Sequence, residues 1–205
     1  MFKIIVCIVF GYLLGSLNGS IIVGKLFYNK DVRTDGSGNA GATNTLRTLG
    51  KAAAAAVTVL DMLKGILACV IGQFLVGYVE NYGFVGMYVA GFAAVLGHNW
   101  PVYFGFKGGK GVLTTFSVIL YISPIPALIC LGVFIIVVAL TRYVSLGSLI
   151  AAISWLVVSI LFNLPIALIF IGGVMVALII VRHKDNIVRL INHSEKKISF
   201  KRNNN

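Results

Sequence analysis

The chain is 205 residues long, with 59% hydrophobic and only 11% charged residues, and its mean hydropathy is +0.97. Charged residues make up about a quarter of an ordinary soluble domain. The composition therefore excludes such a domain and predicts a polytopic integral membrane protein. The net charge of +11 suits a cytoplasmic face that lies against anionic lipid.

Apolar segments recur along the chain, and a helix that crosses about 30 Å of hydrocarbon needs about 20 residues. The first segment has only Lys3 before its apolar run, and we interpret it as a retained helix rather than a signal peptide. The stretch 112–140 is broken by Ser-Pro-Ile-Pro at 123–126, and we divide it there. The sequence thus predicts an all-α, compact bundle of about seven helices, at 2–24, 52–78, 82–104, 112–122, 125–140, 144–162 and 165–181.

The basic residues predict the orientation of this bundle. Fifteen of the 17 Lys and Arg gather in four segments, at 25–51, 107–110, 142 and 182–202. The connections near residue 80 and at 163–165 contain no cation. Cytoplasmic connections carry the excess of Lys and Arg, so we expect the N-terminus outside and the C-terminus in the cytoplasm.

Small residues inside the apolar segments predict close packing. Glycines spaced by four residues favour helix–helix contact, and the first segment has three, at Gly11, Gly15 and Gly19. The three cysteines stand singly in apolar runs, which indicates small hydrophobic filler rather than disulfides or metal ligands, at Cys7, Cys69 and Cys130.

Asp61 and Lys64 are the only charged pair deep inside a predicted span. Charges at that depth are expensive, and a functional role is the default hypothesis. Their i, i+3 spacing equally allows mutual neutralisation as a structural lock. The sequence leaves both interpretations open.

A first polar segment, 36–47, follows the first span. Its glycines let the backbone turn N–H groups toward one point, and Arg47 supplies a fork suited to phosphate oxygens. A helix that starts near 42–44 adds further donors. The alternative is a flexible loop, but such loops are usually richer in Lys, Glu and Pro. We predict an anion site from Gly36, Ser37, Gly38, Asn39, Thr43, Asn44 and Arg47.

A second polar segment, 97–112, again places glycine amides and an ammonium together at the start of a helix. It is not a Walker A loop, because Phe104 stands where the first glycine of that pattern belongs and Gly111 follows the lysine. We predict substrate binding by Gly108, Gly109, Lys110 and Gly111, and leave the role of His98 open.

Two further polar segments lie at 141–148 and 182–195. Ser145 and Ser148 share one face of a helix that starts beside Arg142, although serine pairs also cap and pack membrane helices. His183 and Asn186 share a face in the same way. A basic juxtamembrane helix is ordinarily a lipid anchor. Here three other segments of the chain are also suited to bind an anion, which favours an anion-binding site that includes this helix.

Several enzyme classes are excluded by what the sequence lacks. It has six carboxylates and no pair positioned to hold Mg²⁺. It also contains neither a GxSxG elbow nor an HxxxxD acyltransferase signature. We expect no metal and no cofactor. A basic, glycine-lined pocket without an obvious nucleophile suits a small phosphorylated substrate and a lipid-soluble partner.

The chain resembles the bacterial acyl-phosphate:glycerol-3-phosphate acyltransferases, the PlsY family. The likeness lies in GSGNAGATNTLRTLGK (36–51), LDMLKG (60–65), GHNWPVYFGFKGGKGV (97–112), TRYVSLGSL (141–149) and RHKDNIVRL (182–190). The resemblance implies transfer of a fatty acyl group from acyl phosphate to the 1-hydroxyl of glycerol 3-phosphate. The products are lysophosphatidic acid and phosphate, in the first step of phospholipid synthesis. It also implies a seven-helix fold in the bacterial plasma (inner) membrane with a cytoplasmic site.

The resemblance also implies residue roles. Phosphate binding and catalysis fall to Ser37 and Arg47, and glycerol 3-phosphate binding to the loop 108–111. Ser145 and Ser148 become candidates for a phosphate contact, between which the sequence does not choose. His183 and Asn186 lie beside the acceptor. Glu195 has a supporting structural role.

We expect one acyltransferase domain at 1–195 and a basic polar tail at 196–205. The expected partners are the two substrates and the lipid bilayer, with no nucleic acid; a monomer is compatible with the sequence, which leaves the oligomeric state open. The base can be His183 or a substrate phosphate oxygen, and direct transfer is favoured over a Ser37 acyl-enzyme. The rival hypothesis is a transporter of phosphorylated metabolites, whose mark would be interrupted helices in two related halves.

Overall fold

The computed structural model describes residues 1–80 and 83–198. Regular structure in this part of the chain is helical, with one isolated antiparallel bridge between Val79 and Gly83. The elements are α1 (Phe2–Gly15), α2 (Gly19–Tyr28), η1 (Val32–Thr34), α3 (Ala42–Leu49), α4 (Lys51–Val76), α5 (Val85–Asn99), η2 (Val102–Phe104), α6 (Val112–Ile122), α7 (Pro124–Thr141), α8 (Val144–Leu161), α9 (Ile166–Arg182) and α10 (Lys184–Ile191).

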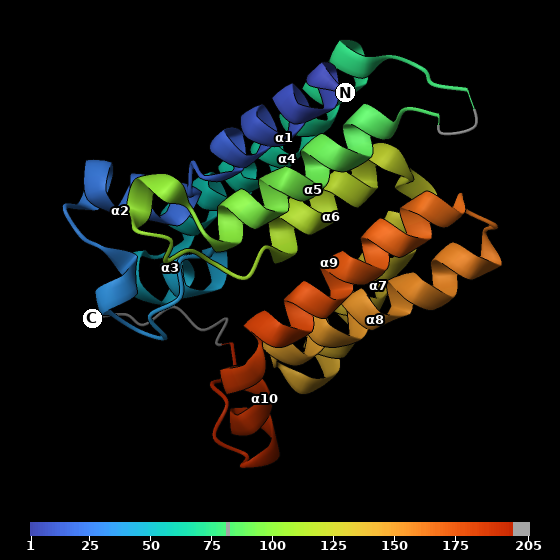
Figure 1. The fold of residues 1–205 in the computed structure, drawn as a ribbon. Helices are drawn as coiled ribbons and strands as arrows, with labels where there is room; N and C mark the ends of the chain where they lie inside the picture. Colours follow the sequence, from blue (N-terminus) through green and yellow to red (C-terminus); the bar gives the residue numbers. More distant parts are fainter. Residues whose placement is uncertain (81–82, 199–205) are drawn as a thin grey trace.

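The long helices form two groups that lie side by side (Figure 1). One group contains α1, α4, α5 and α6, in which α5 packs against both α1 and α4. The other contains α7, α8 and α9. A buried cluster joins the two groups through Cys69 of α4, Val95 of α5, Val118 of α6 and Met175 of α9.

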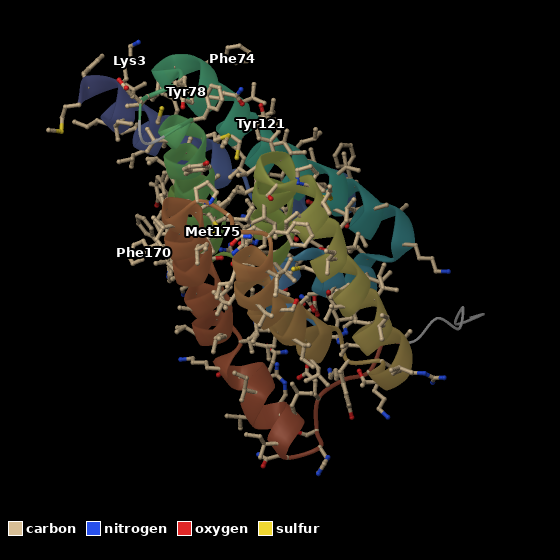
Figure 2. All side chains as sticks on the ribbon, turned by 90° about the vertical axis from the view of Figure 1, so that its right-hand side faces the viewer. Lys3, Phe74, Tyr78, Tyr121, Phe170 and Met175 are labelled. Carbon is tan, nitrogen blue, oxygen red and sulfur yellow. The ribbon has the colours of Figure 1, made fainter. Side chains whose placement is uncertain are left out.

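The protein is an integral membrane protein. Within the described residues, four segments are long and apolar enough to cross a membrane, at Phe2–Tyr28, Lys51–Val76, Pro124–Thr141 and Val144–Leu161. The pair α9 and α10 adds a fifth if its two helices, which meet at an angle of 58°, form one span. Large apolar side chains face outward, where lipid can cover them; Phe74 and Phe170 point away from the bundle (Figure 2).

Two predicted helices are shorter than expected. The predicted helix 2–24 is broken at Ser16–Asn18, because the Asn18 side chain caps α2 by accepting the Ile21 N–H at 3.1 Å. The predicted helix 82–104 is α5, which ends at Asn99, before Pro101. The sequence carries a signal for the first break, since Gly-Ser-Leu-Asn-Gly-Ser at 15–20 places the capping residue Asn18 inside an otherwise apolar segment.

The predicted packing roles of the small residues are confirmed. A Cβ atom on Gly15 would lie 2.5 Å from Ala94 Cα, and one on Gly11 would lie 3.1 Å from Ala90 Cα, so α1 and α5 touch through their backbones. Gly19 instead faces α4. The three cysteines are buried and free, as filler requires.

The polar segments gather at one end of the molecule. Lys3, Phe74 and Tyr78 lie at one end of the bundle, and α10 lies at the other (Figure 2). The loop 29–41, α3 and the loop 100–111 lie away from the end that holds Lys3 (Figure 1). Of the predicted tail 196–205, residues 199–205 lie outside the described part. The Arg47 guanidinium donates to the Lys196 carbonyl, and the Ile198 N–H donates to the Arg142 carbonyl.

Candidate active site

A polar cavity of about 190 Å³ opens where the four polar segments meet. It brings together most of the residues that the sequence singled out, namely Ser37, Asn39, Thr43, Asn44, Arg47, Lys110, Gly111, Ser145, Ser148, His183, Asn186 and Glu195. Gly36, Gly38, Gly108 and Gly109 belong to the same loops without lining it. Thr58 and Phe134 are among the further lining residues that the sequence did not single out.

Four helices begin at this cavity: α3, α6, α8 and α10. Within the part of the chain that the structure describes, the N-cap residue of each of the four makes no side-chain hydrogen bond to the helix. A helix N-terminus carries partial positive charge and free N–H donors. Four such termini around one cavity, together with Arg47 and Lys110, make a site for anionic oxygens.

The first loop is held in shape by Asn44. Its Oδ1 accepts the Ser37 N–H at 2.8 Å, and its Nδ2 donates to the carbonyls of Val32 and Asp35 at 2.8 and 3.0 Å. Gly36 adopts φ +66° directly against the Asn44 side chain, a conformation and a space that favour glycine. Asn44 therefore shapes the loop through its side-chain amide. The amide oxygen and nitrogen are already hydrogen-bonded to backbone groups of the protein.

The second loop is clamped from two sides. The Gly109 N–H donates to the His98 carbonyl at 3.1 Å. Arg182 donates to the carbonyls of Gly108 and Gly109 at 3.2 and 2.8 Å, and its guanidinium lies 5.4 Å from the Trp100 ring centroid. Sequence reasoning placed Arg182 near the site but missed this clamp, because its carbonyl partners lie more than 70 residues away.

Lys110 is a partly buried cation that lines the polar cavity. Burial lowers its pKa to about 8; Glu195 opposes this effect, and the nearby Arg189, Arg47 and Arg182 add to it. Its ammonium donates to Asn186 Oδ1. The Lys110 ammonium has further protons to donate beside the cavity. It can therefore form charge-assisted hydrogen bonds to the oxygens of a phosphate group.

Glu195 ties together three segments of the site. Ser145 Oγ and Asn186 Nδ2 donate to its Oε1 at 2.9 and 2.7 Å, and Arg189 Nε donates to Oε2 at 2.7 Å. Burial opposes ionisation of this carboxyl, but these hydrogen bonds outweigh burial and lower its pKa. Ser148 instead donates to the Val144 carbonyl at 2.9 Å. Both serine hydroxyls are thus engaged within the protein.

His183 presents an unprotonated nitrogen to the cavity. Its Nδ1 lies 2.7 Å from the Ile179 carbonyl, which only accepts, so Nδ1 carries the proton and Nε2 is free of one. Burial, followed by the positive charge of Lys110, lowers the pKa of His183 to about 4. At neutral pH the ring is therefore an uncharged acceptor.

An apolar cavity of about 380 Å³ adjoins the polar one. The two share Thr58, Val112, Leu113, Phe134 and Ser148. Its remaining walls come from side chains of α4, α6, α7, α8 and α9, which are apolar apart from Thr115. Within the described residues, no three His, Cys, Asp or Glu side chains lie close enough together to hold a metal ion. The site therefore combines an anion pocket with an apolar pocket.

Comparison with known proteins identifies the family of this chain. The model of the family described as glycerol-3-phosphate acyltransferase matches residues 5–193. The glycerol-3-phosphate acyltransferase of Clostridioides difficile (strain 630) is 43% identical, and that of Thermoanaerobacter sp. (strain X514) is 40% identical, each over 98% of both chains. The chain belongs to the PlsY family of glycerol-3-phosphate acyltransferases.

Two solved structures of PlsY (YgiH), an integral membrane glycerol 3-phosphate acyltransferase, share the fold at 39% identity. The glycerol 3-phosphate form has a TM-score of 0.88 and matches over 96% of both chains. The lysophosphatidic acid form has a TM-score of 0.85 and matches over 96% of this chain and 95% of its own. The PlsY likeness thus extends over almost the whole chain and includes every segment that builds the cavity.

Proposed function

We propose that the protein transfers a fatty acyl group from acyl phosphate to the 1-hydroxyl of glycerol 3-phosphate, and so starts phospholipid synthesis. The products are lysophosphatidic acid and inorganic phosphate. The observation that carries this proposal is the junction of a cationic, amide-rich cavity with an apolar one of twice its volume. The two forms of the related PlsY structures name the acceptor and the product of that reaction.

Glycerol 3-phosphate is an anion of the size that the polar cavity suits. Its phosphate would lie among Arg47, Lys110 and the first amides of α3 and α6, where cations and helix termini converge. Its 1-hydroxyl would face His183. The phosphate of the second substrate would be held by the Ser37 loop.

The acyl chain would occupy the apolar cavity. Burial of apolar area contributes roughly 25 cal/mol per Å², and the cavity walls are almost wholly apolar. Thr58, Val112 and Leu113 border both cavities, so the acyl carbonyl would lie beside the first turn of α6. N–H groups at that turn would stabilise the charge that develops on the carbonyl oxygen.

The transfer would be direct. The 1-hydroxyl oxygen bonds to the acyl carbon, its proton passes to a base, and the bond from that carbon to the phosphate oxygen breaks with release of phosphate. Within the described residues Ser37 Oγ has no hydrogen bond to a histidine or carboxylate, which disfavours an acyl-enzyme. His183 Nε2 is a weak base, but acyl phosphate is already activated; a substrate phosphate oxygen is the alternative proton acceptor.

The finer topology belongs to the same proposal. We propose about seven crossings of the bacterial plasma (inner) membrane, with the N-terminus outside and the site and C-terminus in the cytoplasm. The distribution of Lys and Arg supports this orientation. Helices α5 and α6 are short for independent spans, at 15 and 11 residues, and would depend on their neighbours.

A two-substrate assay tests the function. The purified protein in detergent should release phosphate only when both palmitoyl phosphate and glycerol 3-phosphate are present. Palmitoyl-CoA and palmitoyl-acyl carrier protein should not replace the donor. Absence of phosphate release, together with glycerol 3-phosphate flux in liposomes, would identify a transporter instead.

A variant distinguishes direct transfer from an acyl-enzyme. Ser37→Ala should lose activity, and wild-type protein quenched during turnover with radiolabelled palmitoyl phosphate should carry no covalent label. A label that appears on wild-type protein and is absent from Ser37→Ala would show that Ser37 is a nucleophile.

A further inference from the structure

Three ionisable side chains are buried together beside the polar cavity. Asp61 and Lys64 come from α4 and His98 comes from the last turn of α5, and they are 0%, 4% and 3% exposed. Asp61 and His98 also line the cavity. The proposed reaction has assigned no role to any of the three, and buried charges in a membrane protein are functional candidates by default.

The Lys64 ammonium uses all three of its protons within the protein. It lies 3.1 Å from the Leu17 carbonyl, 2.8 Å from Asp61 Oδ1 and 2.9 Å from His98 Nδ1. An ammonium group donates three hydrogen bonds and accepts none. His98 Nδ1 lies 2.9 Å from this donor and 3.5 Å from Asp61 Oδ1, so the shorter contact makes Nδ1 the acceptor, and the ring proton then lies on Nε2.

Asp61 keeps Lys64 in this position. Its Oδ1 also accepts the Gly19 N–H at 3.2 Å, and its carbonyl accepts from Thr114 Oγ1 at 3.2 Å. The ion pair is thus attached to α2 and α6 as well as to α4. A buried ammonium without a carboxylate partner would lose its charge, and the tautomer of His98 would no longer be determined.

The free edge of the His98 ring faces the anion-binding loops. A Cβ atom on Gly109 would collide with His98 Nε2 and with the Ala40 carbonyl, so the ring edge lies where the first and second loops meet. His98 lines the cavity and its Nδ1 is turned toward Lys64, so Nε2 is the ring nitrogen left to meet a ligand. Within residues 1–80 and 83–198, no acceptor takes the Nε2 proton.

We propose that His98 is a substrate-binding residue whose Nε2–H donates to a substrate phosphate oxygen, and that Asp61 and Lys64 are positioning residues that hold it in this tautomer. The inference rests on the proposed function. The phosphate can belong to glycerol 3-phosphate or to acyl phosphate, since both carry the same acceptor oxygens. His183 has the opposite tautomer, so the site contains one imidazole that donates and one that accepts.

Two substitutions of His98 separate its two ring nitrogens. His98→Asn keeps an oxygen near the Nδ1 position for Lys64 but leaves no donor at the Nε2 position. His98→Gln extends a primary amide to the Nε2 position. We expect His98→Asn to lower kcat/KM by about 10- to 100-fold, as for a lost hydrogen bond to a charged group, and His98→Gln to recover part of that loss.

The KM values of the His98 variants show which substrate carries the phosphate that His98 contacts. A rise in the KM for glycerol 3-phosphate assigns the bond to the acceptor substrate, and a rise in the KM for palmitoyl phosphate assigns it to the donor. Equal kcat/KM in wild type and both variants would overturn the inference while leaving the proposed function intact. An inactive wild type would instead overturn the proposed function.

The tautomer itself is measurable without a variant. Protein labelled with ¹⁵N-histidine should show one ring, assigned to His98 by its absence from His98→Asn or His98→Gln, protonated at Nε2 and unprotonated at Nδ1. Glycerol 3-phosphate or inorganic phosphate should shift that Nε2 resonance. A ring protonated at Nδ1, or an Nε2 resonance that neither ligand moves, would overturn the inference even if His98→Asn does not fold.

The double variant Asp61→Asn/Lys64→Met tests the positioning role. It removes both buried charges together, so no unpaired charge is left inside the protein. The new side chains are similar in size to those that they replace. We expect the His98 ring to become a mixture of tautomers and kcat/KM to fall, with the change in tautomer as the readout that a merely structural role would not move. An unchanged tautomer would contradict the role given to the ion pair.

Discussion

At the scale of single residues, the site controls charge through burial. Lys110 and His183 both lose basicity because they are buried, and the charge of Lys110 lowers the pKa of His183 further. Glu195 is a carboxylate that opposes both effects at close range, whereas Asp61 is already paired with Lys64. The cavity therefore keeps a positive potential at neutral pH, while its histidine stays uncharged.

Lys110 should produce an alkaline limit to activity. With a pKa of about 8, its ammonium is present at pH 7 and is lost as the pH rises through that value, so phosphate binding weakens. We expect kcat/KM for glycerol 3-phosphate to fall above about pH 8. Lys110→Arg should move this limb to higher pH, because a guanidinium stays protonated. An identical alkaline limb in Lys110→Arg would show that another group titrates.

Glu195 should tune the same limb. Its negative charge raises the pKa of Lys110, so Glu195→Gln should lower that pKa and move the alkaline limb to lower pH. The amide oxygen can still accept from Ser145 and Asn186, whereas Glu195→Ala leaves both without their acceptor. We expect activity to fall by about tenfold or more in Glu195→Ala and by less in Glu195→Gln. Steady-state kinetics across pH tests both the shift and the order.

At the scale of elements, close backbone approach rather than large side chains joins α1 to α5. A Cβ atom at Gly15 would lie within 2.6 Å of the Ala94 backbone. Small residues allow helices in a membrane to approach closely and gain van der Waals contact. The same glycine spacing in the sequence predicted this contact, but not that Gly19 would turn to α4 after the break at Ser16–Asn18.

Alanine substitutions of two helical glycines should affect the stability of the protein differently. Gly15→Ala should destabilise the protein by about 1–3 kcal/mol through overpacking against α5. Gly132→Ala in α7 has nothing within 4 Å of the new methyl group, so it should be neutral or stabilise by roughly 0.5–1 kcal/mol through helix propensity. Thermal unfolding in detergent compares them. A loss of stability in both would point to a general intolerance of added side chains.

Much of the site was predictable because polar residues stand out in an apolar chain. Glycines, hydroxyls and cations at 36–47 and 108–111 predicted an anion site, and the structure brings both segments to the polar cavity. The hydrogen bonds from Arg182 to Gly108 and from Ser145 to Glu195 were not predictable, since the partners lie 50 or more residues apart. The tautomer of His98 likewise depends on Lys64, which lies 34 residues earlier and one helix away. Residue types indicate chemistry, whereas only distances indicate which groups are already occupied.

At the scale of the whole molecule, the two helix groups form a site that consists of a polar cavity and an apolar cavity. The polar cavity lies where four helices begin, and the apolar cavity runs between the groups toward α9. Residues shared by both cavities border the place where an acyl carbonyl would meet a hydroxyl. If the acyl chain occupies the apolar cavity as proposed, the size of that cavity would limit which chains can bring their carbonyl to that border.

Filling the apolar cavity should change the preferred acyl chain. Ala151 lines it, so Ala151→Phe should shorten the space available and reduce kcat/KM for palmitoyl phosphate by about 10- to 100-fold. Octanoyl phosphate needs less of the cavity and should be affected far less. The neighbouring Ile150 is exposed and does not line the cavity, so Ile150→Phe should leave the ratio of the two donors as in wild type. An equal loss with both donors in Ala151→Phe would mean that the chain binds elsewhere, because only a chain that reaches Ala151 can sense its size.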